Sequence, residues 1–336
     1  MKQIQFSSFG RPCSVARCAD VADVGAPFSW EVVVDIEMFP INVADMAMLS
    51  GDYGTLPSSF PSTIGMEAVG RVSDCGTAIK DLAQGDRVLV LANNNWAERR
   101  KVSRAAVYKL PNDIELSQAS LLKVNPATAY LLLKSCSPLE AGDWIIQSAP
   151  LSSVGQCILQ LANAQGIKTV NVVHREGMED DIFKLGGDVV VENGSELKER
   201  VHEAVGLDPI RLALDAVAGP GVQQLADCLS DGGQVVNYGM LSAESCALSP
   251  NQTIFRNISL KGFWLSKILN RLSRNERTAL FDTLSHLVIN KKLKMDVDSY
   301  FPITEVSQAL MRAEQRGRKG KVLIYTKFAP EGFSQV

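Results

Sequence analysis

Residues 143–155, DWIIQSAPLSSVG, decide the fold of this chain. The run 143–149 is short and apolar, a turn of small residues follows, and residues 156–165 repeat apolar side chains at helical spacing. This order predicts a buried strand, a tight turn and a helix that packs on the strand. The stretch therefore indicates the first strand–turn–helix step of an α/β domain.

The same alternation continues toward the C-terminus. Each further apolar run is followed by a segment with helical periodicity, and these runs lie at 169–173, 188–191, 211–217 and 234–238. Strands that are apolar on both faces and alternate with helices form a parallel sheet covered on both sides. We therefore predict a doubly wound parallel sheet in residues 119–295.

The N-terminal part of the chain has a different rhythm. Short strand-like segments alternate there with glycine-containing turns, at 31–38, 68–74 and 86–91. This spacing predicts a mostly β domain, to which the last strand-like run, 321–326, is expected to return. The 336 residues amount to about two ordinary domains. We expect them to be 1–118 with 296–336, and 119–295.

Composition and charge exclude several classes of function. Hydrophobic residues make up 46% of the chain, charged residues 21%, and 34 basic against 37 acidic side chains give a net charge of −3. Nucleic acid and anionic membranes are therefore poor partners, and no apolar stretch of about 18 residues is present to span a bilayer. The seven cysteines are scattered and the N-terminus resembles no targeting signal, so we expect a cytoplasmic protein.

The turn that follows the first strand is the expected ligand site of a doubly wound sheet. Helix N-terminal amides face the pyrophosphate of a dinucleotide at this point. Gly155 alone remains of a GxGxxG-type fingerprint, which also fits an ordinary strand-to-helix turn. Ser152 and Ser153 are small, however, and their hydroxyl groups can donate to phosphate. The context therefore favours a dinucleotide.

The end of the second predicted strand indicates which dinucleotide binds. NAD-binding proteins place a carboxylate there for the ribose 2′-hydroxyl, whereas a cation accommodates a 2′-phosphate. Here the strand ends in His174-Arg175, with no acid before Glu176. Arg175 can grip a phosphate with two parallel hydrogen bonds, so the sequence predicts NADPH; the alternative is a solvated surface arginine.

The domain order resembles that of the medium-chain dehydrogenase/reductase superfamily over nearly the whole chain. The resemblance implies an α/β fold with a GroES-like, mostly β catalytic domain and a Rossmann nucleotide-binding domain. Within the superfamily the chain looks most like the 2-enoyl thioester reductases of mitochondrial fatty-acid synthesis and their bacterial relatives. Five segments carry this similarity: FPIN (39–42), SGDYG (50–54), VNPATAY (124–130), NYGM (237–240) and KGFWLS (261–266).

The resemblance implies that Tyr53 is the catalytic tyrosine. It also implies a set of residues around NADPH: Asn42, Asn125, Thr128, Leu151, Ser152, Ser153, Val154, His174, Arg175, Tyr238, Gly239, Met240, Leu241, Phe263, Trp264, Leu265, Ser266 and Lys321. Trp264 fits a wall of the ligand pocket and core packing equally well. Leu151-Ser152 departs from the asparagine–serine pair usual in these enzymes.

The residue types argue against a catalytic metal. Only three histidines are present, and the first 173 residues contain none. By resemblance, Met66 in GMEAVG (65–70) takes the place of a zinc-binding histidine of zinc alcohol dehydrogenases, and Asn42-Val43-Ala44-Asp45 the place of a cysteine ligand. A thioether does not suit a zinc site, so no metal is expected.

The chemistry of a 2-enoyl thioester fits these residues. Its reduction needs hydride at Cβ, stabilisation of the developing enolate and a proton at Cα. A phenol can supply the hydrogen bond or the proton, and Tyr53 lies in a glycine-flanked loop suited to presenting it. We expect NADPH-dependent reduction of an enoyl thioester on coenzyme A or acyl carrier protein, and the family resemblance implies a homodimer. The alternatives are a zinc-free NADPH:quinone oxidoreductase and a non-enzymatic NADPH-binding protein.

Overall fold

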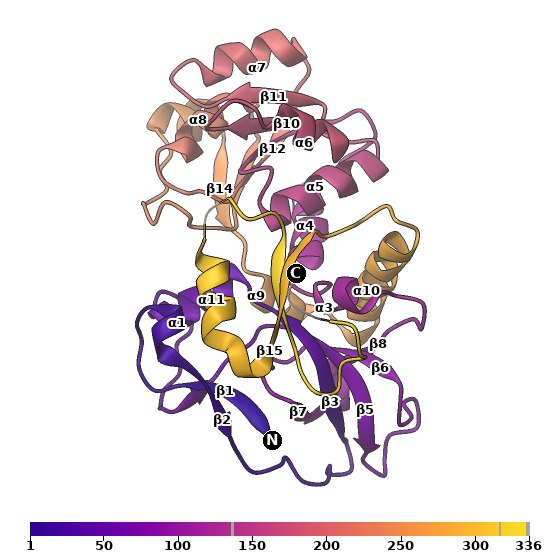
Figure 1. Cartoon of the computed structure of the whole chain (residues 1–336). Coiled ribbons are helices and arrows are strands. Elements are labelled where there is room, and N and C mark those ends of the chain that lie inside the picture. Colours follow the sequence, from indigo (N-terminus) through magenta and orange to yellow (C-terminus); the bar gives the residue numbers. More distant parts are fainter. Residues whose placement is uncertain (136–137, 316, 334–336) are drawn as a thin grey trace. The chain divides into compact units, whose positions relative to one another are not determined.

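The structure is a computed structural model that describes residues 1–135, 138–315 and 317–333 (Figure 1). Contacts divide the chain into two compact units. The N/C unit consists of Met1–Val124 with Ser273–Val336, and the central unit of Asn125–Leu272. The expected ranges, 1–118 with 296–336 and 119–295, differ at both junctions, and as functional domains they stay a prediction.

The central unit is built on the parallel sheet that the apolar runs predict. Its strand order is β11-β10-β9-β12-β13-β14, and every neighbouring pair is parallel. The strands are β9 (Trp144–Ser148), β10 (Lys168–Val173), β11 (Val189–Glu192), β12 (Ile210–Asp215), β13 (Gln234–Asn237) and β14 (Ser259–Gly262). The helices are α4 (Asn125–Leu133), α5 (Ser153–Ala164), α6 (Glu179–Lys184), α7 (Leu197–Val205), α8 (Gly221–Asp227) and α9 (Leu265–Arg271), with one π-helical turn, η2 (Asn251–Phe255).

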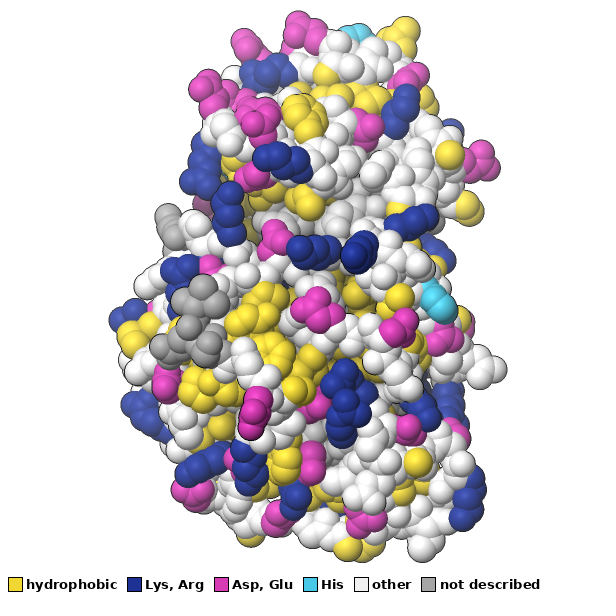
Figure 2. Space-filling model, turned by 45° about the vertical axis from the view of Figure 1, so that its right-hand side comes forward, with side chains coloured by type: hydrophobic (Ala, Val, Ile, Leu, Met, Phe, Trp, Pro, Cys, Tyr) yellow, Lys and Arg dark blue, Asp and Glu magenta, His cyan; other side chains and the backbone are white. Residues whose placement is uncertain are grey.

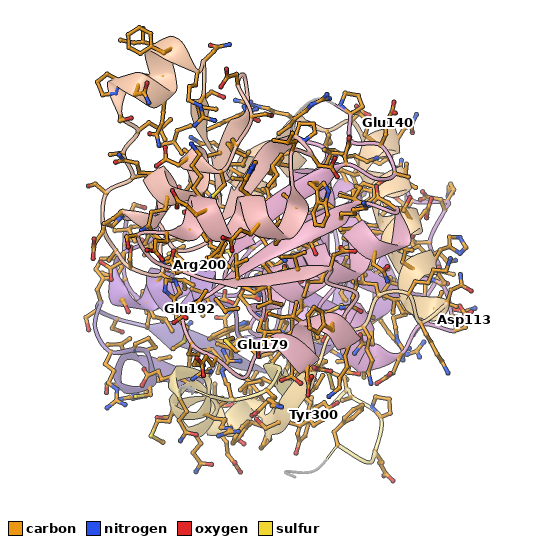
Figure 3. All side chains as sticks on the ribbon, turned by 90° about the horizontal axis from the view of Figure 1, so that it is seen from above. Asp113, Glu140, Glu179, Glu192, Arg200 and Tyr300 are labelled. Atoms are coloured by element: carbon orange, nitrogen blue, oxygen red, sulfur yellow. The ribbon has the colours of Figure 1, made fainter. Side chains whose placement is uncertain are left out.

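The position of β9 explains its unbroken apolar run. All five of its residues are buried, because the strand lies inside a sheet covered on both faces. The chain passes from β9 to β11 in one direction and then returns to β12. Right-handed crossovers therefore place α5 and α6 on one face and α7 and α8 on the other (Figure 1). Arg200 of α7 donates from Nε to the carbonyl oxygen of Glu192 over 3.1 Å and so ties the helix to the end of β11 (Figure 3).

The N/C unit contains two sheets. One has the order β2-β1-β4; the other has the order β15-β16-β3-β5-β6-β8, with β7 also paired to β3. The strands are β1 (Lys2–Phe6), β2 (Ala16–Asp20), β3 (Glu31–Pro40), β4 (Ser62–Thr63), β5 (Ala68–Cys75), β6 (Arg87–Val90), β7 (Arg99–Ser103), β8 (Val107–Lys109), β15 (Val297–Pro302) and β16 (Lys321–Tyr325). The helices are α1 (Pro12–Val15), α2 (Val43–Ser50), α3 (Leu116–Ser120), α10 (Arg274–Ile289) and α11 (Val306–Glu314), with 3-10 turns η1 (Arg104–Ala106) and η3 (Ile303–Glu305).

The C-terminal segments join the N-terminal ones in this unit. Strand β16 pairs antiparallel with β3, so that Ile324 lies opposite Phe39. The return of the last strand is thereby confirmed. Helix α10 also belongs to the N/C unit, because Phe281 packs on Tyr108 of β8 with the ring centroids 5.5 Å apart. This packing moves the second junction to 272/273.

The charge of the surface and the length of the helices concern two classes of partner, nucleic acids and membranes. Acidic and basic side chains are interspersed over the face shown in Figure 2. Among the helices of the described residues, none combines the length and the apolarity that a membrane crossing requires. Six of the cysteines carry free thiols, and Cys136 lies outside the described residues.

Candidate active site

The expected site residues are divided between the two units, and each group is described in its own unit. Asn42, Tyr53 and Lys321 belong to the N/C unit, and the other expected NADPH-binding residues belong to the central unit. In the central unit most of them follow the carboxyl ends of parallel strands, which is where doubly wound sheets bind ligands.

The turn between β9 and α5 is built on tight backbone packing. Ser152 caps α5, and its Oγ accepts a hydrogen bond from the Gly155 amide over 3.2 Å. A Cβ on Gly155 would lie 2.5 Å from the carbonyl oxygen of Ala149 and 2.6 Å from that of Pro150, so only glycine fits. The remaining turn residues are half-buried and remain accessible: Leu151, Ser152, Ser153 and Val154.

A buried polar network joins the carboxyl ends of three adjacent strands. Ser148 of β9 donates its hydroxyl to Asp215 Oδ1 of β12 over 2.8 Å, and Asn237 of β13 donates its amide to Asp215 Oδ2 over 2.7 Å. The carboxylate of Asp215 also accepts hydrogen bonds from the amides of Val217 and Ala218. The network fixes the loop after β12. Sequence reasoning assigned none of these three residues to the site, although Asn237 begins the NYGM segment and each is a polar residue that closes an apolar run.

The segment after β13 approaches this loop closely. A Cβ on Gly239 would lie 2.4 Å from the carbonyl oxygen of Ala216, so the backbones touch. The Tyr238 hydroxyl is buried beside Ser152 without a hydrogen bond of normal geometry, and burial raises its pKa. The protein therefore encloses this hydroxyl next to Ser152. Met240 and Leu241, in contrast, are exposed.

The segment after β14 is joined to the same edge of the sheet. The amide of Phe263 donates to the carbonyl oxygen of Asn237 over 2.8 Å. The next residue, Trp264, occupies the N-cap position of α9. Trp264 is half-buried, and the centroid of its ring lies 4.8 Å from Lys267 Nζ. Leu265 and Ser266 are half-buried as well. The segment is therefore neither wholly in the core nor wholly in solvent.

The end of β10 carries the residues expected at the ribose. His174 and Arg175 are both exposed, and His174 Nδ1 lies 3.4 Å from the amide of Asn193. Among the described residues, the Arg175 guanidinium has neither an acidic partner nor a hydrogen bond. Asn125 and Thr128 are buried in α4, which packs on α5.

These groups fit a phosphorylated dinucleotide. The open first turn of α5 offers backbone amides for a pyrophosphate, Ser152 offers a hydroxyl donor, and Arg175 offers a guanidinium that no carboxylate engages among the described residues. Gly239 is required because its backbone lies against the loop after β12. The donor set suits anionic groups, and its one carboxylate, Asp215, is fully occupied by hydrogen bonds.

In the N/C unit, Asn42 lies at the centre of a second buried network. Its Oδ1 accepts a hydrogen bond from Lys321 Nζ over 2.8 Å, and its Nδ2 donates to Glu67 Oε1 over 2.8 Å. The other carboxylate oxygen of Glu67 accepts the amides of Lys123 and Val124, each over 2.9 Å. These are the last two residues before the central unit begins. Sequence reasoning named Asn42 and Lys321 as NADPH-binding residues, which stays a prediction, and gave no role to Glu67 or Lys123.

The carboxylates of this network are far from water. Burial raises the pKa of Asp45 to about 7, although the amides of Asn42 and Met66 donate to it over 2.9 and 3.0 Å. Burial also raises the pKa of Glu67 and lowers that of Lys123 to about 8. Within the network each charge therefore depends on its neighbours for compensation.

Met66 takes part in this network through its backbone. Its amide donates to Asp45, its carbonyl oxygen accepts from Lys123 Nζ, and its side chain is buried. Across the ranges 1–135, 138–315 and 317–333, no group of three or more His, Cys, Asp or Glu side chains is placed to hold a metal ion. Function without zinc stays a prediction that rests on the residue types at 42 and 66.

The Phe9 ring lies near both ends of the loop that carries Tyr53. Phe9 Cγ lies 3.0 Å from the position of a Cβ on Gly51, which has φ +88° and ends α2. At the other end of the loop, Phe60 packs edge-on against Phe9 with the centroids 5.2 Å apart. Tyr53 itself is half-buried. Helix α2, about 12 Å long, separates the Tyr53 loop from Asn42.

Comparisons with known proteins identify the family. The alcohol dehydrogenase GroES-like domain matches residues 29–110, and the zinc-binding dehydrogenase family matches residues 153–285. The mitochondrial enoyl-acyl-carrier-protein reductase of Dictyostelium discoideum is 32% identical over 332 residues, which is 96% of this chain and 94% of that protein. The Rattus norvegicus and Homo sapiens proteins of the same name are 33% and 31% identical, over 92% of this chain and 84% of theirs.

Solved structures show the same fold. Quinone oxidoreductase of Escherichia coli, complexed with NADPH, has a TM-score of 0.86 at 25% identity, over 97% of this chain and 100% of that one. A mutant enoyl thioester reductase of Candida tropicalis has a TM-score of 0.83 at 21% identity, over 96% and 99%. The α/β fold with a GroES-like and a Rossmann part is thereby confirmed. The chain belongs to the medium-chain dehydrogenase/reductase superfamily of oxidoreductases.

Proposed function

We propose that this oxidoreductase reduces the carbon–carbon double bond of a 2-enoyl thioester, carried on coenzyme A or acyl carrier protein, with NADPH. Relatives more than 30% identical over nearly the whole chain are named enoyl-acyl-carrier-protein reductases. The observation that carries the proposal is the position of Tyr53. It is half-buried, on a loop whose two ends, Gly51 and Phe60, both lie against the Phe9 ring. A phenol held in place is the group that this reaction needs.

The residues of the central unit account for cofactor binding in this proposal. NADPH, when bound, supplies the hydride. The first turn of α5 and Ser152 bind the pyrophosphate, and Arg175 binds the 2′-phosphate, because a guanidinium matches phosphate geometry. The structurally similar quinone oxidoreductase of Escherichia coli was solved in complex with NADPH, which supports a nicotinamide cofactor here. The half-buried segment Phe263 to Ser266 lies beyond Asn237 and borders the same edge of the sheet.

Tyr53 supplies the acid chemistry in this proposal. As hydride reaches Cβ, negative charge develops on the thioester oxygen, and a hydrogen bond from the phenol stabilises it. The phenol, or a water molecule that it orients, then delivers a proton to Cα. A carboxylate in the same place would be repelled by the developing charge. The two glycines that flank Asp52-Tyr53 let the loop present the ring without a bulky neighbour.

The reaction is tested by following NADPH absorbance with crotonyl-coenzyme A as the substrate. Wild-type protein should turn over, and Tyr53→Phe should lose about a hundredfold or more in kcat, since one positioned proton donor contributes about that factor. Tyr325→Phe is the matched control, because it removes a half-buried phenol of β16 outside the proposed site. Unchanged turnover in Tyr53→Phe would refute the role of the phenol.

A quinone reductase is the second candidate, and one observation favours it. The Escherichia coli quinone oxidoreductase has nearly the same fold over its whole length. Delivery of hydride to a quinone needs no proton donor at a fixed carbon, so it would not depend on Tyr53. Reduction of 1,4-benzoquinone without turnover of any enoyl thioester would establish this alternative. Binding of NADPH with neither activity would instead indicate a non-enzymatic protein.

We also propose that the protein is a homodimer. Strand β14 is one of the two edge strands of the central sheet, the other being β11; all four residues of β14 are exposed, and the exposed Ile254 and Phe255 lie just before it. An unpaired edge with apolar neighbours is suited to pairing with a second copy. Cytoplasmic location stays a prediction, and the names of the curated relatives include the word mitochondrial.

A further inference from the structure

A cavity in the N/C unit has no part in the proposed reaction. Its volume is about 210 Å³, and one side is formed by Leu91, η1 and β8 while α10 forms the other. It shares no residue with the Asn42 network or with the Tyr53 loop. The α10 residues that line it recur every three or four positions and so occupy one face of the helix. They are Arg274, Arg277, Thr278, Phe281 and Asp282.

The cavity carries an excess of positive charge. Arg104, Lys109, Arg274 and Arg277 line it, against one carboxylate, Asp282. Two acids lie outside the lining and compensate part of this charge. Asp81 is shared between Arg104 and Arg274 at 2.8 and 2.7 Å, and Asp86 pairs with Lys109 at 2.7 Å. Together the four cations and three acids leave one positive charge, and it is centred on Arg277.

Arg277 is the residue that points to a ligand. Its side chain is half-buried, yet within the described part of the chain its guanidinium has no hydrogen bond and no acidic partner. Arg274, one helical turn earlier, uses a single nitrogen on Asp81. The pair therefore offers unused donors of two planar guanidinium groups, an arrangement that suits phosphate oxygens.

The floor of the cavity is apolar. Val107 and Phe281 are buried there, and the Tyr108 ring packs on Phe281 while its hydroxyl donates to Asp282 over 2.5 Å. Asp282, the one carboxylate in the described lining, thus accepts a hydrogen bond from a phenol, and no ion pair joins it to Arg274 or Arg277. A cavity of about 150 Å³ is large enough for benzene, so this one accommodates a ring next to a charged group.

We propose that this cavity binds a small phosphate monoester with an apolar or aromatic body. The phosphate engages Arg274 and Arg277, and the body lies on Val107, Tyr108 and Phe281. A dianion is favoured over a carboxylate, because it neutralises the charge on Arg277 and still has oxygens for the unused donors of Arg274.

Calorimetric titration of the full chain with phenyl phosphate tests the site, with and without saturating NADPH. Phenyl phosphate should bind in both cases, because the cavity shares no residue with the proposed nucleotide site. Inorganic phosphate, which lacks the ring, and benzoate, which lacks the second charge, should each bind more weakly. Arg277→Gln should weaken phenyl phosphate binding about tenfold or more. Arg211→Gln, at an exposed arginine of β12, is the charge-matched control and should change nothing.

A second measurement needs no variant. Phenylglyoxal modifies accessible arginines, and mass spectrometry maps the modified positions. Phenyl phosphate should slow modification of Arg274 and Arg277 but not of Arg211. Absence of phenyl phosphate binding, equal affinity of wild type and Arg277→Gln, or loss of binding when NADPH is present would each overturn the proposal. These outcomes are independent of whether the protein reduces enoyl thioesters.

Discussion

Lys321 Nζ donates a hydrogen bond to Asn42 Oδ1 over 2.8 Å, although 279 positions separate the two residues in the chain. Both side chains are buried, and the side-chain amide of Asn42 donates a second hydrogen bond to Glu67. The ammonium group also lowers the pKa of Asp45 and of Glu67 relative to burial alone. The pairing of β16 with β3 creates this contact, which lies beside the start of α2, the helix that leads to the Tyr53 loop.

Replacement of Lys321 tests how far the network depends on its cation. Lys321→Met should lower the free energy of unfolding by about 3 kcal/mol, because it removes a buried cation that compensates the carboxylates of Asp45 and Glu67 and leaves that task to Lys123. Lys80→Met, at an exposed lysine of the same unit, should have no measurable effect. Denaturant unfolding of the two variants and the wild type decides; equal midpoints for Lys321→Met and the wild type would show that the ammonium group is not needed.

Asp45 should make stability depend on pH. Its pKa is about 7 in the folded protein and about 3.8 when unfolded, so the native state binds more protons between these values. The free energy of unfolding therefore falls as pH rises, by about 2 kcal/mol from pH 5 to pH 7.5. Asp45→Asn should reduce this slope, leaving the contribution of Glu67, whereas Asp113→Asn, at an exposed carboxylate, should keep it. Unfolding curves at the two pH values measure the difference, and identical slopes in all three proteins would contradict the assignment.

Phe9 should act on turnover through the loop of Tyr53. Phe9→Ala removes the ring that contacts Gly51 and Phe60, at a cost of about 2 kcal/mol for a partly exposed aromatic side chain. We expect faster hydrogen exchange in residues 51–60, a lower kcat with crotonyl-coenzyme A and partial recovery in Phe9→Leu. Phe28→Ala, at a largely exposed ring, is the control.

A double-mutant cycle separates positioning from general damage. In the Tyr53→Phe background, Phe9→Ala should cause little further loss of kcat if both substitutions act through the same phenol. Additive losses would mean that Phe9 acts elsewhere. If Tyr53→Phe keeps full activity, the proposed reaction fails first and the Phe9 result no longer concerns catalysis.

Arg175 should determine the choice of cofactor. Arg175→Ser should weaken NADPH binding about tenfold or more and leave NADH binding unchanged, because only NADPH carries the 2′-phosphate. Fluorescence titration with both cofactors gives the ratio of dissociation constants. Arg211→Ser is the control for the lost charge. A parallel loss for NADPH and NADH would assign Arg175 to another part of the cofactor.

The open edge of β14 should form the dimer. The amides of Ser259 and Phe263 donate inward to Gly233 and Asn237, so the amide of Leu260 faces the edge by alternation. Leu260→Pro should therefore give a monomer without loss of the sheet, whereas Leu260→Val should remain a dimer. Sedimentation velocity distinguishes the two states. A dimeric Leu260→Pro would place the interface elsewhere.

Local pattern was enough to predict the parallel sheet. Burial on both faces makes β9, β10 and β12 apolar along their length, and the amphipathic period of α5 follows from its contact with that sheet. The need for glycine at 155 was visible as a turn signal, and the structure gives its cause in the carbonyl oxygens of Ala149 and Pro150. These properties depend on residues near one another in the chain.

The local sequence pattern could not predict contacts between residues far apart in the chain. The expected junction at 295/296 left α10 with the nucleotide-binding segment, because nothing local to α10 reveals that Phe281 packs on Tyr108. Glu67 and Lys123 read as ordinary charged residues until the fold buries them together.

The sequence by itself determined the alternation of strands and helices, the cation at the end of β10 and the absence of histidine from the first 173 residues, since each is a property of neighbouring residues or of composition. Only the tertiary structure decided that Lys321 reaches Asn42, that the Phe9 ring lies near both ends of the Tyr53 loop, and that Arg277 lines a cavity with an apolar floor and has no partner in the described chain. The physical reason is that sheet pairing and helix packing bring distant residues together and remove them from water, and neither distance nor burial is encoded at a single position.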